Sequence, residues 1–254
     1  MSFDGQVAIV TGASRGIGRA IAMALASQGA DIVVAARAEP VPGTVEQTAL
    51  AVQGLGQRAI PIDMDVTIEA DVQRTVDQTL ESFGRVDILV NNAATNRHRN
   101  VVDFEPRRWD LIMRVNVYGP FLLSKYVLPH MIKQGSGQIL NISSMSSIRH
   151  HPGSSAYSAS KAALDALTLG LSQEVAESKI SVNALRVDGT VETPGATMLL
   201  GLQQDEPMWP PELIGEAASF VCGQPFPYTG KIVTVTELRS QVARIDEILS
   251  RLEK

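Results

Sequence analysis

The sequence predicts an α/β fold, in which helices cover both faces of a parallel β-sheet to give three layers, α/β/α. Two observations support this. Short apolar runs alternate with helical patterns along the chain, an order that produces parallel sheets with helices on both faces. The 254 residues, 44% hydrophobic and 19% charged, show no internal repeat and no low-complexity linker. One large doubly wound domain is therefore expected.

Seven strands and six helical stretches are expected in alternation. The strands are predicted at residues 6–10, 31–36, 58–62, 86–90, 136–142, 180–186 and 231–235. The helices are predicted at about 15–28, 44–55, 68–83, 105–133, 155–178 and 211–222. The pattern assigns residues 1–235 to a single domain and 236–254 to an amphipathic helical tail.

A glycine-rich turn lies between the first strand and the first helix. Residues 11–18 read T-G-A-S-R-G-I-G, and a run rich in helix formers follows and ends at Gly29. Glycines allow a sharp turn close to a pyrophosphate, and a helix N-terminus offers unpaired N–H groups. The spacing G-x-x-x-G-x-G differs from the G-x-G-x-x-G of long-chain dehydrogenases. Taken alone, the turn is also compatible with an ordinary tight turn.

Tyr157 and Lys161 are four residues apart in a predicted helix, so the phenol and the ammonium lie on one face. A neighbouring cation favours the phenolate and lowers the pKa of a tyrosine. A proton donor works best with a pKa near the working pH. The pair therefore indicates acid–base chemistry, although an isolated Y-x-x-x-K also fits an exposed helical pair without a role.

Together the two signals resemble the short-chain dehydrogenase/reductase family of Rossmann-fold proteins. Four more segments occur in the family's order and spacing: 63–66 (DMDV), 91–94 (NNAA), 116–119 (NVYG) and 141–144 (NISS). The resemblance implies a seven-stranded doubly wound sheet with the cofactor at the carboxyl ends of the strands. Segments 182–185 and 196–198 are most similar to the hydroxysteroid dehydrogenase-like branch, which does not define a steroid substrate.

The family's dinucleotide-binding positions can be carried over residue by residue. Asp65 and Val66 are similar to an adenine-binding pair, and 92–94 to the segment over the adenosine ribose. The resemblance implies that the cofactor is bound by Gly12, Ser14, Arg15, Gly16, Ile17, Gly18, Arg37, Asp65, Val66, Asn92, Ala93, Ala94, Tyr157, Lys161, Val191 and Thr193.

The charge at the end of the second strand predicts which cofactor is preferred. Ala36 stands where an acidic residue would bind the adenosine ribose and select NAD. Arg37 follows directly and Arg15 lies in the glycine turn, and guanidinium groups pair well with a 2′-phosphate. We therefore expect NADP(H) to be preferred and NAD(H) to be possible. Either arginine could instead point to solvent, leaving dual specificity.

For the chemistry, the resemblance implies a catalytic tetrad of Asn116, Ser144, Tyr157 and Lys161. Ser144 is chosen over Ser143 because the family's serine precedes its tyrosine by thirteen residues. Ser144 and Tyr157 would hydrogen-bond the substrate oxygen, and Tyr157 would donate the proton. Lys161 would hold the nicotinamide ribose and lower the tyrosine pKa, and Asn116 would anchor a relay water. By residue type alone, Ser143 satisfies strand-end backbone groups and Asn116 is a helix-distorting structural amide.

Two departures from the family pattern bear on activity and assembly. At 187–189 the chain reads Val-Asp-Gly where Pro-Gly is common, so Asp188 is expected to place a carboxylate near the nicotinamide and could impair catalysis. Val242, Ile245, Ile248, Leu249 and Leu252 recur at helical spacing in the tail. Because so short a helix is unstable alone, it should pack on its own subunit or a neighbour, and we expect a homodimer or homotetramer.

Two loops that line the family's substrate pocket are basic here, at 97–99 (RHR) and 149–151 (RHH). Clustered cations at a cleft mouth favour an anionic substrate, although solvated loop charges also explain them. A small carbonyl or alcohol compound, anionic or neutral, is therefore the expected substrate.

Composition bounds the remaining possibilities. The net charge of −5 gives no reason to expect nucleic-acid binding. A single cysteine, Cys222, suits a reducing compartment, and no signal peptide, membrane span or metal-ligand set is expected, so the protein is expected to be cytoplasmic. The leading hypothesis is an NADP(H)-dependent oxidoreductase. The alternative is a catalytically impaired dinucleotide-binding regulatory or scaffold protein, and an epimerase of the extended branch fits the length and glycine spacing less well.

Overall fold

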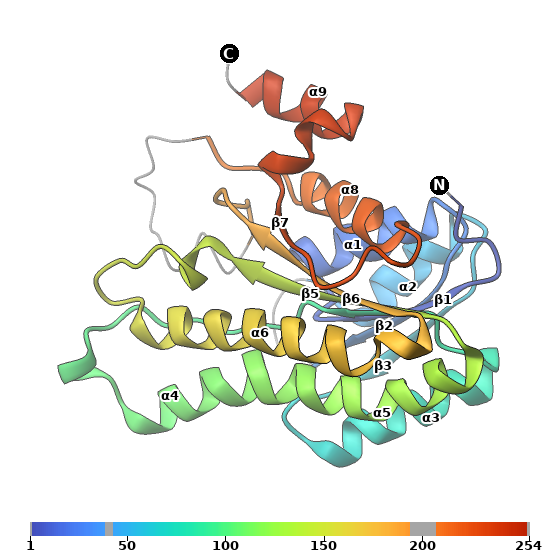
Figure 1. The fold of residues 1–254 in the computed structure, drawn as a ribbon, viewed down its shortest axis with the longest axis horizontal. Coiled ribbons are helices and arrows are strands. Elements are labelled where there is room, and N and C mark those ends of the chain that lie inside the picture. The colour runs from blue at the N-terminus through green and yellow to red at the C-terminus, as the bar shows by residue number, and fades with distance from the viewer. Residues whose placement is uncertain (1, 39–42, 194–206, 253–254) are drawn as a thin grey trace.

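The computed structural model describes residues 2–38, 43–193 and 207–252. Its sheet has seven parallel strands in the order β3-β2-β1-β4-β5-β6-β7 (Figure 1), which confirms the predicted doubly wound α/β fold. The strands are β1 Val7–Thr11, β2 Asp31–Ala36, β3 Ala59–Asp63, β4 Ile88–Asn91, β5 Gly137–Ser144, β6 Ile180–Val187 and β7 Ile232–Thr234. The strand predicted at 231–235 is one residue shorter at each end in the structure.

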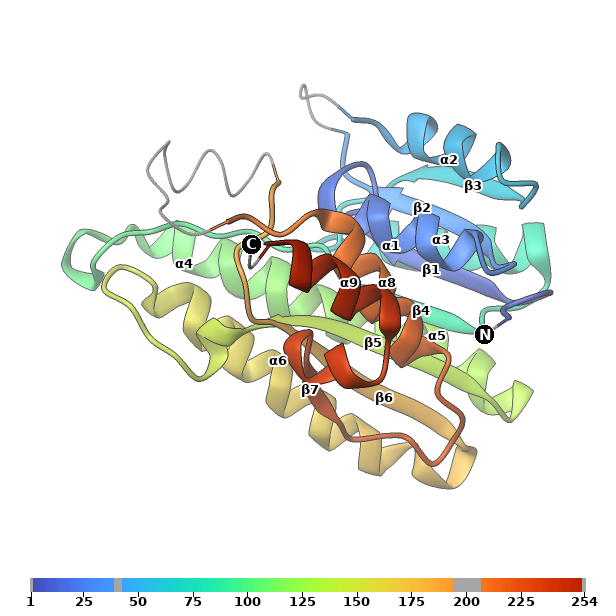
Figure 2. The same ribbon diagram turned by 90° about the horizontal axis from the view of Figure 1, so that it is seen from above.

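Helices cover both faces of the sheet, with α1, α2 and α8 on one face and α3, α5 and α6 on the other (Figures 1 and 2). The helices are α1 Gly16–Ala26, α2 Val45–Gln53, α3 Glu69–Phe83, α4 Pro106–Met113, α5 Gly119–Gln134, α6 Ser155–Glu174, α8 Pro211–Cys222 and α9 Ala243–Leu252. None of the helices in the described part of the chain is both long and apolar enough to cross a bilayer.

The continuous apolar runs of the central strands are explained by this two-sided burial. In β1, Ala8 and Val10 point into the core under α1 and α8, whereas Val7 and Ile9 point into the core under α3 and α5. Successive side chains of a strand alternate between faces, so a strand buried on both faces is apolar at every position. This is why continuous apolar runs mark the central strands in the sequence.

The first and the eighth helices pack closely against each other. A Cβ atom added at Gly215 of α8 would lie 2.7 Å from the carbonyl oxygen of Ala20 in α1. Only a glycine permits backbones to approach at that distance. The helix that begins at the glycine turn is thus packed against a segment near the other end of the chain.

The C-terminal tail packs on its own subunit. A 3₁₀-helix, Thr236–Ser240, leads into α9, and Ile245, Ile248 and Leu249 of α9 are buried in the same core as α8. The sequence allows the tail to pack on its own subunit or on a neighbour. In the structure the apolar face of α9 packs against α8 of the same subunit.

Candidate functional site

The glycine turn between β1 and α1 lies at the carboxyl edge of the sheet, where β2 and β4 flank β1. Gly12 and Gly16 have φ of +65° and +53°, a region that favours glycine. A Cβ at Gly18 would lie 2.2 Å from the carbonyl oxygen of Gly12. The N-cap Arg15 makes no side-chain hydrogen bond to the first turn of α1, which contains no acidic residue. An uncapped N-terminus of this kind suits an anion such as a pyrophosphate.

Thr11 and Asn92 hold the turn against the end of β4. The Thr11 hydroxyl donates to the carbonyl of Val90 at 3.3 Å and accepts from the backbone N–H of Asn92 and of Ala93, each at 3.0 Å. The Asn92 Nδ2 donates back to the carbonyl of Thr11 at 2.8 Å. Thr11 was not among the predicted site residues. The sequence signal for it is a hydroxyl at the point where a buried strand meets glycine.

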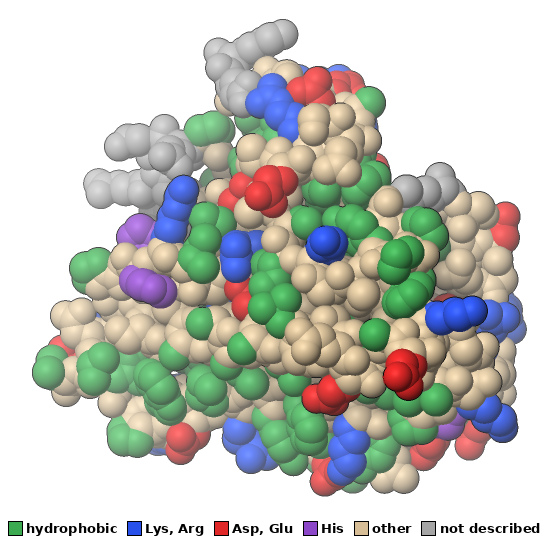
Figure 3. All heavy atoms as spheres, viewed as in Figure 1, with side chains coloured by type: hydrophobic (Ala, Val, Ile, Leu, Met, Phe, Trp, Pro, Cys, Tyr) green, Lys and Arg blue, Asp and Glu red, His purple; other side chains and the backbone are tan. Residues whose placement is uncertain are grey.

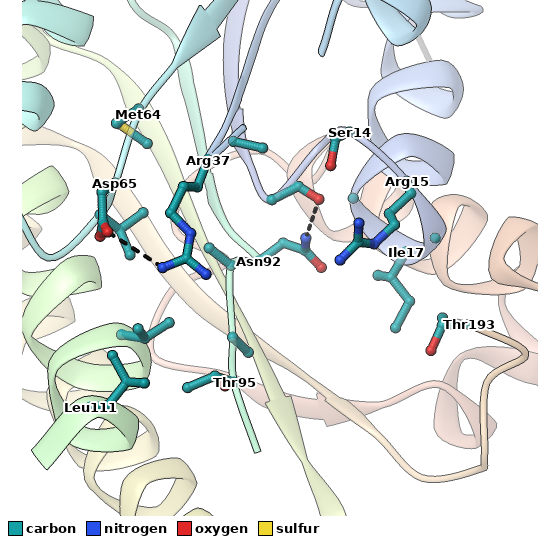
Figure 4. A pocket seen from close by; sticks show the side chains of 18 residues that line it. Ser14, Arg15, Ile17, Arg37, Met64, Asp65, Asn92, Thr95, Leu111 and Thr193 are labelled. Atoms are coloured by element: carbon teal, nitrogen blue, oxygen red, sulfur yellow. Dashed lines mark hydrogen bonds and ion pairs between the residues drawn. The ribbon is translucent and has the colours of Figure 1, made fainter. Parts of the chain in front are cut away.

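A cavity of about 390 Å³, the glycine cavity, opens beside this turn (Figure 4). It is lined by Gly12, Ser14, Arg15, Gly16, Ile17, Gly18, Ala36, Arg37, Met64, Asp65, Val66, Asn92, Ala93, Ala94, Thr95, Leu111, Val115 and Thr193. Most of the predicted cofactor-binding residues are in this set. Leu111 and Val115 were missed, and their signal is an i,i+4 apolar pair on the helical segment just before Asn116.

Arg37 and Arg15 reach the glycine cavity from different loops, and Figure 4 shows their guanidinium groups on either side of Asn92. The Arg37 Nη1 lies 3.7 Å from Asp65 Oδ2. Asp65 is fixed in turn, because its Oδ1 accepts from both the N–H and the hydroxyl of Thr67 at 2.8 Å. The predicted pair of cations therefore lines one cavity, with Ala36 contributing no competing carboxylate.

A second cavity of about 210 Å³, the tyrosine cavity, adjoins the first. It is lined by Ile17, Asn92, Ala94, Ile142, Ser143, Ser144, Tyr157, Lys161, Val187, Gly189, Val191 and Thr193. Four of these residues, Ile17, Asn92, Ala94 and Thr193, also line the glycine cavity. The two cavities are thus parts of one cleft, which brings Ser144, Tyr157 and Lys161 to its inner end.

The Tyr157 phenol is protonated over the whole neutral range in this structure. Burial raises its pKa to about 12, and a hydrogen bond with Ser144 acts in the opposite direction. The expectation that Lys161 lowers this pKa is wrong for the structure as it stands. The Lys161 Nζ lies 5.6 Å from the centre of the tyrosine ring and donates to the carbonyl of Ile142 at 2.7 Å. The ammonium is therefore held by the strand and not by the phenol oxygen.

Lys161 is almost completely buried, and this determines its charge. Burial lowers its pKa to about 8, while the carboxylate of Asp165, one turn further along α6, raises it. A cation taken out of water loses its hydration, so the lysine is poised between its charged and neutral forms close to neutral pH.

The two serines at the end of β5 differ in their contacts. Ser144 Oγ accepts from the N–H of Ser146 at 3.2 Å and is hydrogen-bonded to Tyr157. The buried Ser143 Oγ has no hydrogen-bond partner among the described residues, so the expectation that it satisfies strand-end backbone groups is wrong. Both line the tyrosine cavity, and the contact with Tyr157 distinguishes Ser144.

Asn116 lies in a π-helix, Arg114–Tyr118, that joins α4 to α5 where one continuous helix was predicted. Its amide pairs with the backbone of Thr95 in both directions, accepting at 2.8 Å and donating at 2.9 Å, and also donates to Ser160 Oγ at 3.0 Å. Ser160 donates to the carbonyl of Tyr157 at 2.7 Å. Asn116 thus joins the loop after β4 to the tyrosine-bearing turn of α6, and the π-helix agrees with a helix-distorting amide.

Asp188 does not line the tyrosine cavity, contrary to the expectation that its carboxylate lies near the nicotinamide. Its Oδ1 accepts hydrogen bonds from the backbone N–H groups of Val235 and Thr236, at 3.1 and 3.3 Å. Two unpaired N–H groups at the end of β7 attract the carboxylate away from the cleft. These contacts also explain why β7 ends at Thr234.

Trp209 packs against the residues that directly follow Asp188. A Cβ at Gly189 would lie 2.3 Å from the Trp209 ring, so the indole packs directly on the glycine. The backbone N–H of Trp209 donates to the carbonyl of Thr190 at 2.7 Å, and its carbonyl accepts from Glu192 at 2.8 Å. Val191, which pairs with Trp209, is thereby held at the wall of the tyrosine cavity.

Comparison with known proteins places this cleft in a family. A family model described as short chain dehydrogenase matches residues 6–200. Hydroxysteroid dehydrogenase-like protein 2 of Danio rerio is 34% identical over 233 residues, which are 88% of this chain and 55% of that protein. The 3-oxoacyl-[acyl-carrier-protein] reductase FabG of Thermotoga maritima is 34% identical over 195 residues, covering 76% of this chain and 77% of that protein.

The structural comparison agrees. NAD⁺-bound xylitol dehydrogenase superposes with a TM-score of 0.85 at 27% identity, covering 92% of this chain and 98% of that chain. The chain spans little more than half the length of its hydroxysteroid dehydrogenase-like relatives. Since the family match runs from the first strand to beyond the sixth, the chain belongs to the short-chain dehydrogenase/reductase family.

Proposed function

We propose that this protein is an NADP(H)-dependent oxidoreductase that interconverts a carbonyl compound and a secondary alcohol, with Tyr157 as the proton donor or acceptor. The observation that supports this best is the single cleft, in which the glycine cavity continues into the cavity that contains Ser144, Tyr157 and Lys161. A dinucleotide bound at the glycine turn would extend along such a cleft toward the tyrosine.

The residues of the cleft fit a nicotinamide dinucleotide. The uncapped first turn of α1 suits its pyrophosphate, and Lys161 together with Val191 would hold the nicotinamide half. Asp65 and Val66, with the apolar Leu111 and Val115, would enclose the adenine. When bound, the cofactor supplies or accepts the hydride.

The protein's own residues handle the proton. Tyr157, protonated because burial raises its pKa to about 12, donates to the substrate oxygen during reduction and receives the proton back during oxidation. The Ser144 hydroxyl orients that oxygen. Lys161, whose Nζ lies 5.6 Å from the centre of the tyrosine ring, would hold the nicotinamide ribose beside this group. Asn116 positions the turn of α6 that carries Tyr157, through its hydrogen bonds with Thr95 and Ser160.

The preference for NADP(H) over NAD(H) is supported by Arg15 and Arg37 at the glycine cavity and by the absence of a carboxylate at Ala36. It is tested by titrating the purified protein with NADPH and NADH and following fluorescence. Arg37→Gln should weaken NADPH binding by about tenfold and leave NADH binding unchanged. Arg107→Gln, a change of equal charge at an exposed site on α4, is the control. Equal affinity for both cofactors in the native protein would contradict the preference.

The impaired-scaffold alternative rested on a carboxylate beside the nicotinamide and on the unusual C-terminus. Asp188 instead contacts the backbone after β7, and α9 packs on α8, away from the Tyr157 side chain. These two contacts support the oxidoreductase over the scaffold. Turnover of any ketone or aldehyde that is lost in Tyr157→Phe would exclude the scaffold.

A homo-oligomer, dimeric or tetrameric, is also proposed. Support comes from an apolar groove of about 470 Å³ on the α4–α6 side of the molecule, lined by Met113, Arg114, Val117, Tyr118, Phe121 and Leu167. Phe121, which lines this groove, is 45% exposed. An exposed apolar groove of this kind is typical of interaction surfaces.

A further inference from the structure

Two loops beside the tyrosine cavity carry a cluster of cationic side chains, which we name the basic rim. It consists of Arg97, His98, Arg99, Arg149, His150 and His151, all of them exposed. The first three follow Ala94, and the others lie between β5 and α6. The backbone N–H of Arg99 donates to the carbonyl of Gly153 at 3.0 Å, so the two loops lie side by side although they are far apart in sequence.

The chain itself keeps the basic rim close to the reacting groups. Arg97 is three residues beyond Ala94, which lines both cavities, and an extended chain of that length spans at most about 11 Å. Arg149 is five residues beyond Ser144, a span of at most about 18 Å. The backbone of the basic rim therefore stays within about 18 Å of residues that line the tyrosine cavity.

The rim arginines form no close ion pair among the described residues, and the one acidic group that interacts electrostatically with Arg97 is Glu105. Among the described residues, no ion pair or side-chain hydrogen bond is made by Arg97, Arg99 or Arg149. The acidic neighbours on the same loop are Asp103 and Glu105, and the Glu105 carboxylate is bound by Arg107 at 2.6 Å. Figure 3 shows histidine side chains next to a Lys or Arg side chain over the β5–α6 loop. A positive rim in a protein of net charge −5 attracts anions.

We propose that the substrate is a small carbonyl or alcohol compound that carries a carboxylate or phosphate group, and that the basic rim binds this group. The inference rests on the proposed oxidoreductase function, because it assumes that the reacting carbon lies at Tyr157. Guanidinium groups bind the oxygens of both anions in bidentate fashion, and imidazole N–H groups add hydrogen bonds. The rim thereby favours substrates that carry an anionic group several bonds away from the carbonyl.

The test measures binding to the full chain saturated with NADP⁺ by calorimetry, using matched probes. The probes are levulinate against methyl levulinate, and dihydroxyacetone phosphate against dihydroxyacetone. In the native protein at least one anion should bind about tenfold more tightly than its neutral partner, since a hydrogen bond to a charged group is worth about 1.5–3 kcal/mol. Which pair shows the preference distinguishes a carboxylate from a phosphate.

Two triple variants with the same change in net charge separate the rim from the overall charge. The combination Arg97→Gln, Arg99→Gln and Arg149→Gln should abolish the preference for the anion. The combination Lys133→Gln, Arg244→Gln and Arg251→Gln, at exposed sites on α5 and α9, should keep it. For a probe that is turned over, the rim variant should raise KM and change kcat little.

The outcomes distinguish this inference from the function on which it rests. NADPH binding is titrated in every sample and should be the same in both triple variants. If NADPH binds but each anion and its neutral partner have equal affinity, including no measurable binding of either, the substrate inference is overturned alone. An equal loss in both triple variants overturns it as well. Failure of the native protein to bind either nicotinamide cofactor overturns the proposed function first.

Discussion

The Asp188 carboxylate accepts a hydrogen bond from the backbone N–H of Val235, with 3.1 Å between Oδ1 and N. This contact joins the end of β6 to the beginning of the C-terminal segment. Val187 and Gly189, on either side of Asp188, line the tyrosine cavity. A residue that departs from the family pattern therefore fixes the wall of the cleft from behind.

Asp188→Ala should lower the free energy of unfolding by about 1–3 kcal/mol, because two backbone N–H groups lose their acceptor. Asp188→Asn should retain most of the stability, since the amide oxygen accepts the same bonds. Urea denaturation measures the stability. NADPH titration tests whether the wall of the cleft is still in place, and only the alanine variant should bind NADPH more weakly. An alanine variant with native stability and native NADPH affinity would show that the carboxylate does not position the wall.

Lys161→Met should stabilise the protein more at neutral than at alkaline pH. The folded lysine loses its proton near pH 8 and the unfolded one near 10.5, so between these values the unfolded chain holds the extra proton. Stability of the native protein then rises with pH across this window, whereas the methionine variant lacks this rise. The difference in free energy of unfolding between variant and native protein should be about 2 to 3 kcal/mol larger near pH 7 than near pH 10.

Thermal or urea unfolding at the two pH values checks this prediction, and every other titrating group cancels between the two proteins. If the difference in free energy of unfolding between the two proteins did not change with pH, burial of Lys161 would not set its charge. The same variant should lose turnover near pH 7, where most of the native Lys161 is charged, because the variant has no side-chain cation at this position.

Alanine variants of the two serines of β5 should differ in turnover and in stability. Ser144→Ala removes the hydroxyl bound to Tyr157 and should reduce kcat by roughly 100-fold. Ser143→Ala removes a buried hydroxyl that has no partner among the described residues, so stability should stay unchanged or rise by up to about 1 kcal/mol. Steady-state kinetics and urea denaturation of both variants check this. A larger loss of turnover in the Ser143 variant would reverse the assignment.

Phe121→Glu should dissociate the proposed oligomer, because it places a carboxylate on the apolar groove. Light scattering during gel filtration measures the mass. Leu50→Glu, at a 66% exposed position on α2, is the matched control and should leave the mass unchanged. A native protein that is monomeric at every concentration would refute the proposal.

The sequence predicts the sheet well because burial on both faces makes the central strands apolar throughout, as in β1. The cleft residues were predictable for a related reason. Parallel strands all end at the same edge of the sheet, so polar motifs that follow successive strands must meet there.

What the sequence did not predict depends on partners that are distant along the chain. The π-helix at Arg114–Tyr118 lies inside one continuous helical pattern, and the amide that it displays binds Thr95. The Lys161 ammonium binds a strand carbonyl that no local pattern specifies. Asp188 contacts residues 47 and 48 positions away. Such contacts follow from packing, which periodicity does not encode.

The close packing of Gly215 on Ala20 has a consequence for synthesis on the ribosome. The helix α1 is complete at Ala26, but its neighbour α8 begins only at Pro211. At 5–20 residues per second, roughly 10 to 40 s separate the two events. During that interval the side of α1 that packs against α8 is open to chaperones and to neighbouring chains. Slower translation late in the message would therefore lengthen the time at risk of aggregation more than slower translation at its start.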